Sequence, residues 1–533
     1  MNQIEIRKRQ MEAVSCVLEM MTLLVLGNIL GDNGIVYLAV ALECLSFFWT
    51  VTGSRVADVL GRLLRGRSSK GQYRNANMLR KNVLFLEGFI GLIGGVILFI
   101  FAGFLGDRFF GVSYSVAMIW ILAPVVLLRT FVSVLLGYFQ GEGTELPSVI
   151  SYVMRQLCIL FFSLVFAGLF DKRGQLVSAL LRQENFTAMY GGMGVALGIL
   201  IAEALVFLFL FLVYRGSRKK ERKSGGEGMR ITDTFGSQAG ALYGTMLPLI
   251  FTALLQQLPI WLGLFFFRRN VADVAAMNDY GVLYGKYIPL VGILLFPACA
   301  LLLESAYKVA GCVRRDEQRF AKGNLSGGLH MAVIYGMFFS VFMAIFASQI
   351  ADVFCSTRVG QATQMIRSGS FVILFAILGF YFSEILLLLG GRMQVLGALA
   401  FYNLVYVIGL LLFLRGGNAG VMALIYAGLI AGAVFVGITG ALLFYQTRLG
   451  VDWLQGGVIP AGAACVTGLL LLFVGKAVTP HLGSLAAILV CLLLGQICYW
   501  LVLLLIRNFR EQELGYIPGG KLIRILGQLL RVF

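Results

Sequence analysis

Four basic residues fall inside stretches of the chain that are otherwise apolar. They are Arg55, Arg129, Arg155 and Lys286. An unpaired charge at the centre of a bilayer costs at least about 2.5 to 3.5 kcal/mol, so such side chains face a protein interior or a water-filled cavity. The planar fork of arginine pairs two phosphate oxygens at once. These residues therefore predict a cationic cavity, and a cationic cavity implies an anionic cargo.

Arg129 and Arg155 lie at matching depths in consecutive apolar stretches. With a rise of about 1.5 Å per residue, both side chains start roughly 12 to 14 Å from the same membrane face, so we expect them to meet at one level. The alternative for both is structural pairing with a buried carboxylate. For Arg55 it is a local ion pair with Asp58, three residues on. For Lys286 it is snorkelling to the outer surface.

Glutamates share these apolar stretches. They are Glu19, Glu43, Glu87, Glu203 and Glu384, with Glu12 one heptad before Glu19. Three roles are open to them: pairing with the cations, binding a coupling cation, or taking up protons. Glu19, Glu43, Glu203 and Glu384 are accordingly candidates for coupling transport to Na⁺ or H⁺.

Other polar and small residues inside the apolar stretches favour helix packing over ligand binding. Gln256, Gln257 and Asn403 are more typical of interhelical hydrogen bonds than of ligand contacts. The run GGMGVALG from Gly191 has no preceding strand, so it predicts close helix packing rather than a phosphate cradle.

The chain has no recognisable enzyme motif. It contains no Walker A loop, no GxSxG and no HExxH, and its histidines are His330 and His481 alone. The nine cysteines are scattered without a CxxC pair, which supports neither a metal site nor a disulfide framework. We therefore predict no catalytic residue, no metal and no cofactor beyond a coupling ion.

Composition identifies a polytopic membrane protein. Hydrophobic residues make up 59% of the 533 residues and charged residues 13%, against about 25% charged in soluble domains. A span needs about 20 apolar residues, and this template predicts about fourteen spans. They lie near 11–30, 35–60, 82–104, 113–138, 148–170, 191–214, 238–266, 281–304, 325–349, 369–390, 395–414, 420–446, 458–476 and 483–506.

The net charge of +17 is unevenly placed. Most lysines and arginines fall in the loops 62–81, 215–230 and 308–322 and near both ends of the chain. By the positive-inside rule, these parts lie in the cytoplasm, as do both termini. The basic excess then reflects insertion and anionic lipid headgroups, and nucleic acid is not an expected partner.

A loose repeat relates the two halves of the chain. Gly34-Ile-Val-Tyr37 is echoed by Gly281-Val-Leu-Tyr284, and each copy opens an apolar span that ends in a basic loop. Such self-similarity suggests duplication of a large unit. Six spans per copy is an even number, so the halves would cross in parallel, related by an axis along the membrane normal, with a cavity between them.

The predicted organisation has five parts. They are an N-terminal six-helix half (1–214), a basic cytoplasmic linker (215–235), a C-terminal six-helix half (236–446), two additional helices (458–506) and a cytoplasmic amphipathic tail (507–533). The two additional helices carry almost no charge, so lipid can surround them and we place them at the periphery. The tail suits an interfacial helix.

Short motifs occur in a characteristic order along the chain. They are GDNGIVY from Gly31, SRVADVLGRLL from Ser54, KGQYRNAN from Lys70, GYFQG from Gly137 and YGVLYGKYIPL from Tyr280. Together with the span count, they resemble the polysaccharide-exporter flippases of the multidrug/oligosaccharidyl-lipid/polysaccharide superfamily. The resemblance is greatest to the stage V sporulation protein B-like branch, a relative of the lipid II flippases. It covers about residues 10 to 450.

The resemblance implies an all-helical, MATE-like fold that alternates between inward- and outward-facing states. It also implies a cationic cavity for a lipid-diphosphate-linked sugar, and a groove beside the last two spans for the polyprenyl tail. Arg55 falls where that family places a cavity arginine, and Lys286 lies near its cationic position on span 8. The first span carries Glu12 and Glu19 where the lipid II branch has arginines, which argues against lipid II itself as cargo.

Three functions are compatible with these residues. The first is a flippase of the bacterial cytoplasmic membrane that moves a polyprenyl-diphosphate-linked saccharide, a cell-wall or polysaccharide precursor, to the outer leaflet. Arg55, Arg129, Arg155 and Lys286 would contact its headgroup, and glycosyltransferases or polymerases of the same pathway would be partners. The second is a Na⁺- or H⁺-coupled multidrug antiporter of the same fold. The third is a non-transporting scaffold for envelope assembly.

Overall fold

The computed structural model describes residues 3–144, 146–183, 185–223, 233–271, 274–416, 419–450, 452–506, 508 and 525. These residues form helices and their connections, with no strand among them. Within this part of the chain, eleven helices are long and apolar enough to cross a membrane, or twelve if the bent pair Val359–Gly369 and Val372–Leu388 is one span. The prediction of an all-helical, multi-pass membrane protein is confirmed.

The two longest candidates each contain two helices. Helix α1 (Gln3–Thr52) has a non-helical residue at Gly31, with φ 69° and ψ 176°. Helix α16 (Ile459–Leu505) has one at Gly483, with φ 74° and ψ 164°. Fifty residues of helix would be about 75 Å long, more than twice the roughly 30 Å of hydrocarbon. If each of these two helices is counted as a pair of spans and the bent pair as one span, the total is fourteen spans. The number of spans itself stays a prediction.

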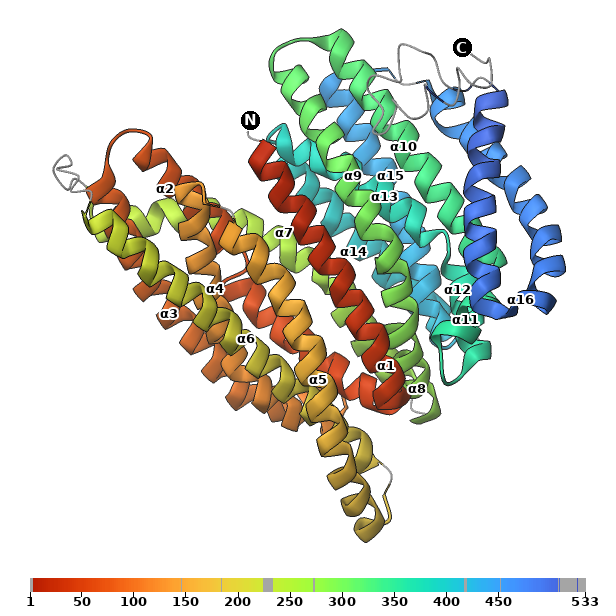
Figure 1. The fold of residues 1–533 in the computed structure, drawn as a ribbon, viewed down its shortest axis with the longest axis horizontal. Helices are drawn as coiled ribbons and strands as arrows, with labels where there is room; N and C mark the ends of the chain where they lie inside the picture. Colours follow the sequence, from red (N-terminus) through yellow and green to blue (C-terminus); the bar gives the residue numbers. More distant parts are fainter. Residues whose placement is uncertain are drawn as a thin grey trace. The chain divides into compact units, whose positions relative to one another are not determined.

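The chain divides into two compact units. The central unit comprises Val25–Gly281, and the composite unit comprises Met1–Leu24 and Val282–Phe533. The central unit contains the second part of α1, α2 (Val56–Ser68), α3 (Tyr73–Gly103), α4 (Val116–Glu142), α5 (Leu146–Leu181), α6 (Asn185–Lys223), α7 (Phe235–Asn270) and most of α8 (Val274–Val282). In Figure 1, α5 and α6 run side by side.

The composite unit holds the remaining helices. They are the first part of α1, α9 (Ile288–Arg314), α10 (Gln318–Ile345), α11 (Ala347–Phe354), α12 (Val359–Gly369), α13 (Val372–Leu388), α14 (Arg392–Arg415), α15 (Met422–Thr447) and α16. A π-helical turn, Leu283–Tyr287, precedes α9. Helix α16 packs on α10 and α11 and leaves many of its leucines exposed.

Packing and sequence order differ at two helices. The start of α1 packs within the composite unit, where Met20 lies against Gly292 of α9. Helix α7 packs within the central unit, where Gln238 accepts a hydrogen bond from Asn82 of α3 at 2.8 Å. The packing units therefore do not coincide with the predicted ranges 1–214 and 236–446. The predicted duplication relates segments by their order along the chain, not by the unit in which they pack, and it stays a prediction.

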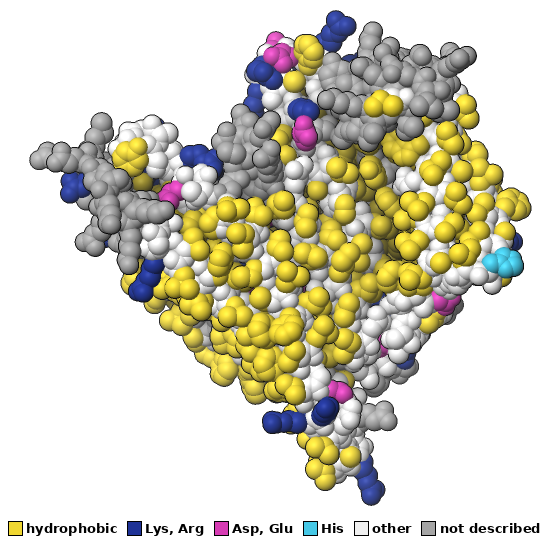
Figure 2. Space-filling model, in the orientation of Figure 1, with side chains coloured by type: hydrophobic (Ala, Val, Ile, Leu, Met, Phe, Trp, Pro, Cys, Tyr) yellow, Lys and Arg dark blue, Asp and Glu magenta, His cyan; other side chains and the backbone are white. Residues whose placement is uncertain are grey.

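Side-chain chemistry follows a membrane pattern. On the face that Figure 2 shows, hydrophobic side chains form a broad band, and the visible lysines, arginines and carboxylates lie mostly at its margins. Exposed side chains along α3, such as Phe85, Phe89 and Ile100, are large and apolar. Lipid is the solvent that such a surface suits. Most of the predicted tail 507–533 and residues 224–232 of the predicted linker lie outside the described residues.

Candidate functional site

Two arginines and one glutamate meet inside the central unit. Nε of Arg129 on α4 donates a hydrogen bond to Oε1 of Glu203 on α6 at 2.7 Å. Nε of Arg155 on α5 lies 3.3 Å from the other oxygen, Oε2. Glu203 is fully buried, whereas the side chains of Arg129 and Arg155 are 16% and 15% exposed. The expectation that the two arginines meet at one level is confirmed, and Glu203 is the residue that joins them.

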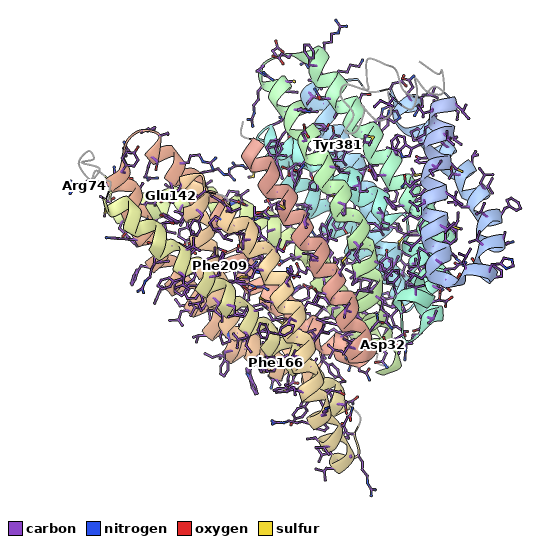
Figure 3. The ribbon with its side chains drawn as sticks, viewed as in Figure 1. Asp32, Arg74, Glu142, Phe166, Phe209 and Tyr381 are labelled. Carbon is purple, nitrogen blue, oxygen red and sulfur yellow. The ribbon has the colours of Figure 1, made fainter. Side chains whose placement is uncertain are left out.

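Small residues on α6 bring these helices together. A methyl group added at Gly198 would lie 2.5 Å from the backbone nitrogen of Ser163. One at Gly194 would overlap the carbonyl oxygen of Phe166, which is labelled in Figure 3. Close packing by the glycine-rich run from Gly191 is thereby confirmed. The two contacts also set the register between α5 and α6.

The same antiparallel register explains why Arg155 reaches Glu203. Residues 174, 166 and 163 of α5 lie against residues 187, 194 and 198 of α6. Continued along both helices, this pairing brings Glu203 to within one turn of Arg155. The glycine spacing is thus a sequence signal for the ion pair, and it becomes readable once the two helices are known to be neighbours.

An aromatic ring completes the cluster. The guanidinium carbon of Arg129 lies 5.4 Å from the ring centre of Trp49, on the part of α1 that belongs to the central unit. A cation above an indole face is stabilised by the ring quadrupole. Four helices, α1, α4, α5 and α6, therefore hold the arginine–glutamate–arginine cluster in place.

The cluster carries one net positive charge, because two guanidinium groups share one carboxylate. Paired charges in a low-dielectric interior are stable only when their geometry is good and their remaining donors are satisfied. Together, the two guanidinium groups have more N–H donors than the one carboxylate can accept. This arrangement can bind an anion with two or more acceptor oxygens.

Lys286 occupies a separate site in the composite unit. Its ammonium donates hydrogen bonds to Thr357, at 2.8 Å to the carbonyl oxygen and 2.5 Å to the hydroxyl. The residue is 1% exposed, so its side chain is buried rather than snorkelling to a surface. It sits in the π-helical turn Leu283–Tyr287, a distortion frequent at functional sites.

Arg55 lies where α1 gives way to α2. It is the residue that caps the start of α2, it is half-buried, and its Nε atom has no hydrogen-bond partner among the described residues. Its predicted role as a headgroup contact stays a prediction, as does local pairing with Asp58.

The four carboxylates predicted for ion coupling have different surroundings. Glu203 is held by two arginines, and Glu384 of α13 pairs with Arg9 of α1 within the composite unit. Glu43 is buried in the central unit, whereas Glu19 is exposed. Glu203 and Glu384 thus serve first as ion-pair partners in this state of the protein.

Two further polar contacts join α7 to the helices beside it in the central unit. Glu87 on α3 is fully buried and accepts a hydrogen bond from the hydroxyl of Tyr243 at 2.6 Å, while its second oxygen has no partner among the described residues. The sequence identifies Glu87 as a carboxylate inside an apolar stretch, but it does not identify Tyr243, 156 residues away, as its partner. Gln257 donates to Ser46 at 2.8 Å and to Thr50 at 2.9 Å, which confirms its interhelical role.

No protein-family model matches the chain. Over 335 residues it is 21% identical to stage V sporulation protein B of Bacillus subtilis (strain 168), a match that covers 62% of this chain. The matched region also spans 62% of that relative, less than two thirds of its length.

Solved structures match over more of the chain. A structure of lipid II flippase MurJ in an inward closed conformation covers 92% of this chain and is itself covered to 96%, with a TM-score of 0.63 and 13% identity. An inward-facing multidrug resistance MATE family transporter of the MOP superfamily covers 81% of this chain and is covered to 96%, with a TM-score of 0.61 and 14% identity. The eukaryotic MATE transporter AtDTX14 covers 86% and is covered to 98%, with a TM-score of 0.58 and 14% identity.

These relatives are flippases and transporters rather than enzymes. Identities of 13% and 14% establish the fold and leave the substrate open. The sequence match and the fold agree with the resemblance seen in the short motifs. The chain is thus similar in sequence to stage V sporulation protein B over part of its length, and it has the fold of the MurJ and MATE transporter structures.

Proposed function

We propose that this protein is a flippase for a polyprenyl-diphosphate-linked saccharide, a precursor of the cell wall or of a surface polysaccharide. It would carry the cargo from the inner to the outer leaflet by alternating access. The observation that carries the proposal is the buried cluster of Arg129, Glu203 and Arg155 with its net positive charge. The fold shared with the lipid II flippase MurJ supports the same class of cargo.

The chemistry of the cargo explains the need for such a cluster. An ionised diphosphate cannot cross bare hydrocarbon, because the cost of burying an isolated charge is tens of kcal/mol by Born solvation. Arginine forks bind phosphate oxygens in pairs, so Arg155 and Arg129 would take over hydrogen bonds that water provides outside the membrane. Glu203 would hold the two guanidinium groups apart and orient them before the cargo arrives. Arg55 is a further proposed headgroup contact, and Lys286 would serve as one only after its ammonium leaves Thr357.

Coupling to Na⁺ or H⁺ is part of the proposal. One elementary charge moved across the membrane is worth about 2.3 kcal/mol per 100 mV, enough to bias a cycle that carries a charged headgroup. Glu19, Glu43, Glu203 and Glu384 are the proposed coupling residues, and two of them, Glu203 and Glu384, form ion pairs with arginines. We further propose the bacterial cytoplasmic membrane as the location, with both termini in the cytoplasm and pathway glycosyltransferases or polymerases as partners.

Transport in proteoliposomes tests this function. The purified protein is reconstituted with a fluorescent polyprenyl-diphosphate saccharide, and the label exposed on the outside is followed with a membrane-impermeant quencher. We expect flipping by the wild type and a loss of at least about tenfold for Arg155→Gln, because the remaining Arg129–Glu203 pair is neutral. Arg155→Lys keeps the charge and should retain more activity than Arg155→Gln.

A matched control separates cargo binding from a general loss of charge. Arg319→Gln removes an exposed arginine near the start of α10 and should flip the cargo at the wild-type rate. If Arg129→Ala and Arg155→Ala also flip at that rate, the cluster does not contact the headgroup. If the wild type moves no lipid-linked saccharide, the proposed function is wrong.

A second function, export of organic cations, is favoured by two observations. The chain shares its fold with MATE transporters, and Glu87 is a buried carboxylate with no cation in contact among the described residues. A proton- or Na⁺-coupled antiporter would use buried carboxylates to bind cationic drugs or the coupling ion. Ethidium efflux by the same proteoliposomes, lost in Glu87→Gln as well as in Glu203→Gln, would support this function over the first.

A further inference from the structure

Two cavities follow one another along the groove between α3 and α4 in the central unit. The first, of about 680 Å³, lies near the ends of α2, α3 and α4, and most of its lining residues are polar, among them Asn77, Arg80 and Thr144. The second, of about 580 Å³, is lined by Leu84, Phe85, Gly88, Phe89, Leu92 and Phe131, with Lys81 at one end. Neither cavity includes a residue of the arginine–glutamate–arginine cluster.

The two cavities continue in one direction because α3 and α4 are antiparallel. Along α3, the polar cavity uses residues 73–80 and the apolar one residues 81–92. Along α4, Phe131 lines the apolar cavity, whereas Tyr138 and the residues that follow it line the polar one. Both helices therefore place the polar cavity next to the α2–α3 loop and the apolar cavity deeper in the membrane.

Arg80 forms the cationic wall of the polar cavity. It is 5% exposed, and its guanidinium carbon lies 4.9 Å from the ring centre of Tyr138 and 5.3 Å from that of Tyr214. The two rings fix the side chain, so its charge is held at the cavity. Lys81, the next residue, is exposed and stands where the polar cavity gives way to the apolar one. Among the described residues that line the polar cavity, Glu142 supplies one carboxylate, at the exposed rim.

The apolar cavity follows α3 over a length that suits a lipid chain. From Lys81 to Leu92, the helix rises about 16 Å, close to the roughly 15 Å of hydrocarbon in one leaflet. Its walls, Phe85, Phe89 and Leu92, are 75%, 57% and 50% exposed. Gly88 leaves room for the ring of Phe131, since an added methyl group would lie 2.8 Å from that ring.

We propose that this paired cavity binds an anionic glycerophospholipid of the surrounding membrane, distinct from the transported cargo. The phosphate would sit between Arg80 and Lys81, and one acyl chain would lie along α3 over Phe131. Among the described lining residues, two cations against one carboxylate favour a headgroup with net negative charge. A soluble phosphate ester would leave the apolar cavity unused, and a neutral lipid would not match the net positive charge of the described lining residues.

Native mass spectrometry of the full chain in detergent tests the proposal. The protein is titrated with dioleoyl-phosphatidylglycerol, dioleoyl-phosphatidylethanolamine or glycerol phosphate, and the bound adducts are counted. We expect phosphatidylglycerol to be retained over phosphatidylethanolamine, and Lys81→Gln to weaken its binding about fivefold, since one basic residue near the membrane surface contributes about 1 kcal/mol. Phe85→Ala should weaken both lipids.

Two exposed positions on the same helix serve as controls. Arg74→Gln and Phe99→Ala remove side chains that line neither cavity, so lipid binding should stay at the wild-type level. Arg80→Lys keeps the charge if Arg80→Gln proves unstable, and it should bind better than Lys81→Gln. Equal retention of both lipids, unchanged by Lys81→Gln, would overturn the proposal. Binding of glycerol phosphate as tight as that of the lipid, with no effect of Phe85→Ala, would overturn it too.

Discussion

At the scale of single residues, Glu203 decides the state of the candidate site. It is fully buried, and it contacts Arg129 at 2.7 Å and Arg155 at 3.3 Å. Removing one partner of a buried ion pair leaves an uncompensated charge, which costs more than the pair itself contributes. The same carboxylate therefore limits the net charge that the cluster offers to a cargo and keeps the two guanidinium groups from repelling each other.

The stability of Glu203→Gln measures this role. We expect a loss of about 3 to 5 kcal/mol in the free energy of unfolding, because two half-buried arginines would face each other without a carboxylate. Denaturant titration in detergent, followed by tryptophan fluorescence, gives the value. Adding Arg129→Gln to this variant should recover part of the loss.

The control is Glu304→Gln on α9. Glu304 pairs with Lys308 at 2.8 Å, but both side chains are about half exposed, at 52% and 53%. Such pairs contribute about 0.5 kcal/mol or less. Equal effects of Glu203→Gln and Glu304→Gln would show that the buried cluster is not a stabilising ion pair.

The hydrogen bond between Tyr243 and Glu87 supplies a second prediction at this scale. Tyr243→Phe removes the donor 2.6 Å from a fully buried carboxyl oxygen, and an unsatisfied buried group costs about 1 to 3 kcal/mol. Thermal unfolding of the purified variant should show this loss. Tyr335→Phe is the matched control, because no hydrogen bond of its hydroxyl is found among the described residues, and it should unfold like the wild type.

At the scale of helices, single glycines turn long apolar stretches into pairs of spans. Gly31 and Gly483 combine a positive φ with an extended ψ. This region of backbone space is essentially reserved for glycine. An added methyl group would meet no atom within 4 Å at either position, so packing does not explain the choice of residue. Each glycine is needed for its backbone conformation alone.

Alanine at these glycines should therefore act through backbone strain. Gly31→Ala and Gly483→Ala are each expected to lower the free energy of unfolding by about 1 to 3 kcal/mol, as denaturant titration can measure. Gly168→Ala on α5 has equal space around it and no positive φ. It should gain about 0.5 to 1 kcal/mol instead, because glycine weakens a helix interior. A stabilising Gly31→Ala would show that α1 does not need its turn there.

At the scale of the whole molecule, charge placement predicts the orientation in the membrane. Basic residues are concentrated in the loops 62–81 and 308–322, which the positive-inside rule assigns to the cytoplasm. The turn between α5 and α6, near Arg182, would then lie outside. The proposed direction of transport depends on this assignment.

Reporter fusions in the cell test the orientation. A phosphatase that is active only after export should be active when fused after Gln183 and inactive when fused after Ser69. A fluorescent protein that matures only in the cytoplasm should give the opposite pattern at both positions. Phosphatase activity after Ser69 alone would invert the topology and reverse the proposed direction of flipping.

Much of the site was predictable because depth in a membrane is a property of sequence position. Counting residues from the span ends placed Arg129 and Arg155 at one level, and the glycine run from Gly191 predicted the close approach of α6 to another helix. Glu203 could not be assigned to either arginine, because a partner across helices depends on how each helix is rotated. The burial of Lys286 against Thr357, 71 residues away, gave no signal in the sequence for the same reason.

By itself, the sequence determined the class of protein: a multi-pass helical membrane protein without an enzyme motif, with charges buried where lipid would exclude them. Hydrophobicity and charge act on each segment separately, so they can be read along the chain. The tertiary structure alone decided which helices share a packed unit, with the start of α1 in the composite unit and α7 in the central one. It also decided that Glu203 joins two arginines, because packing between distant segments depends on shape complementarity that no local pattern records.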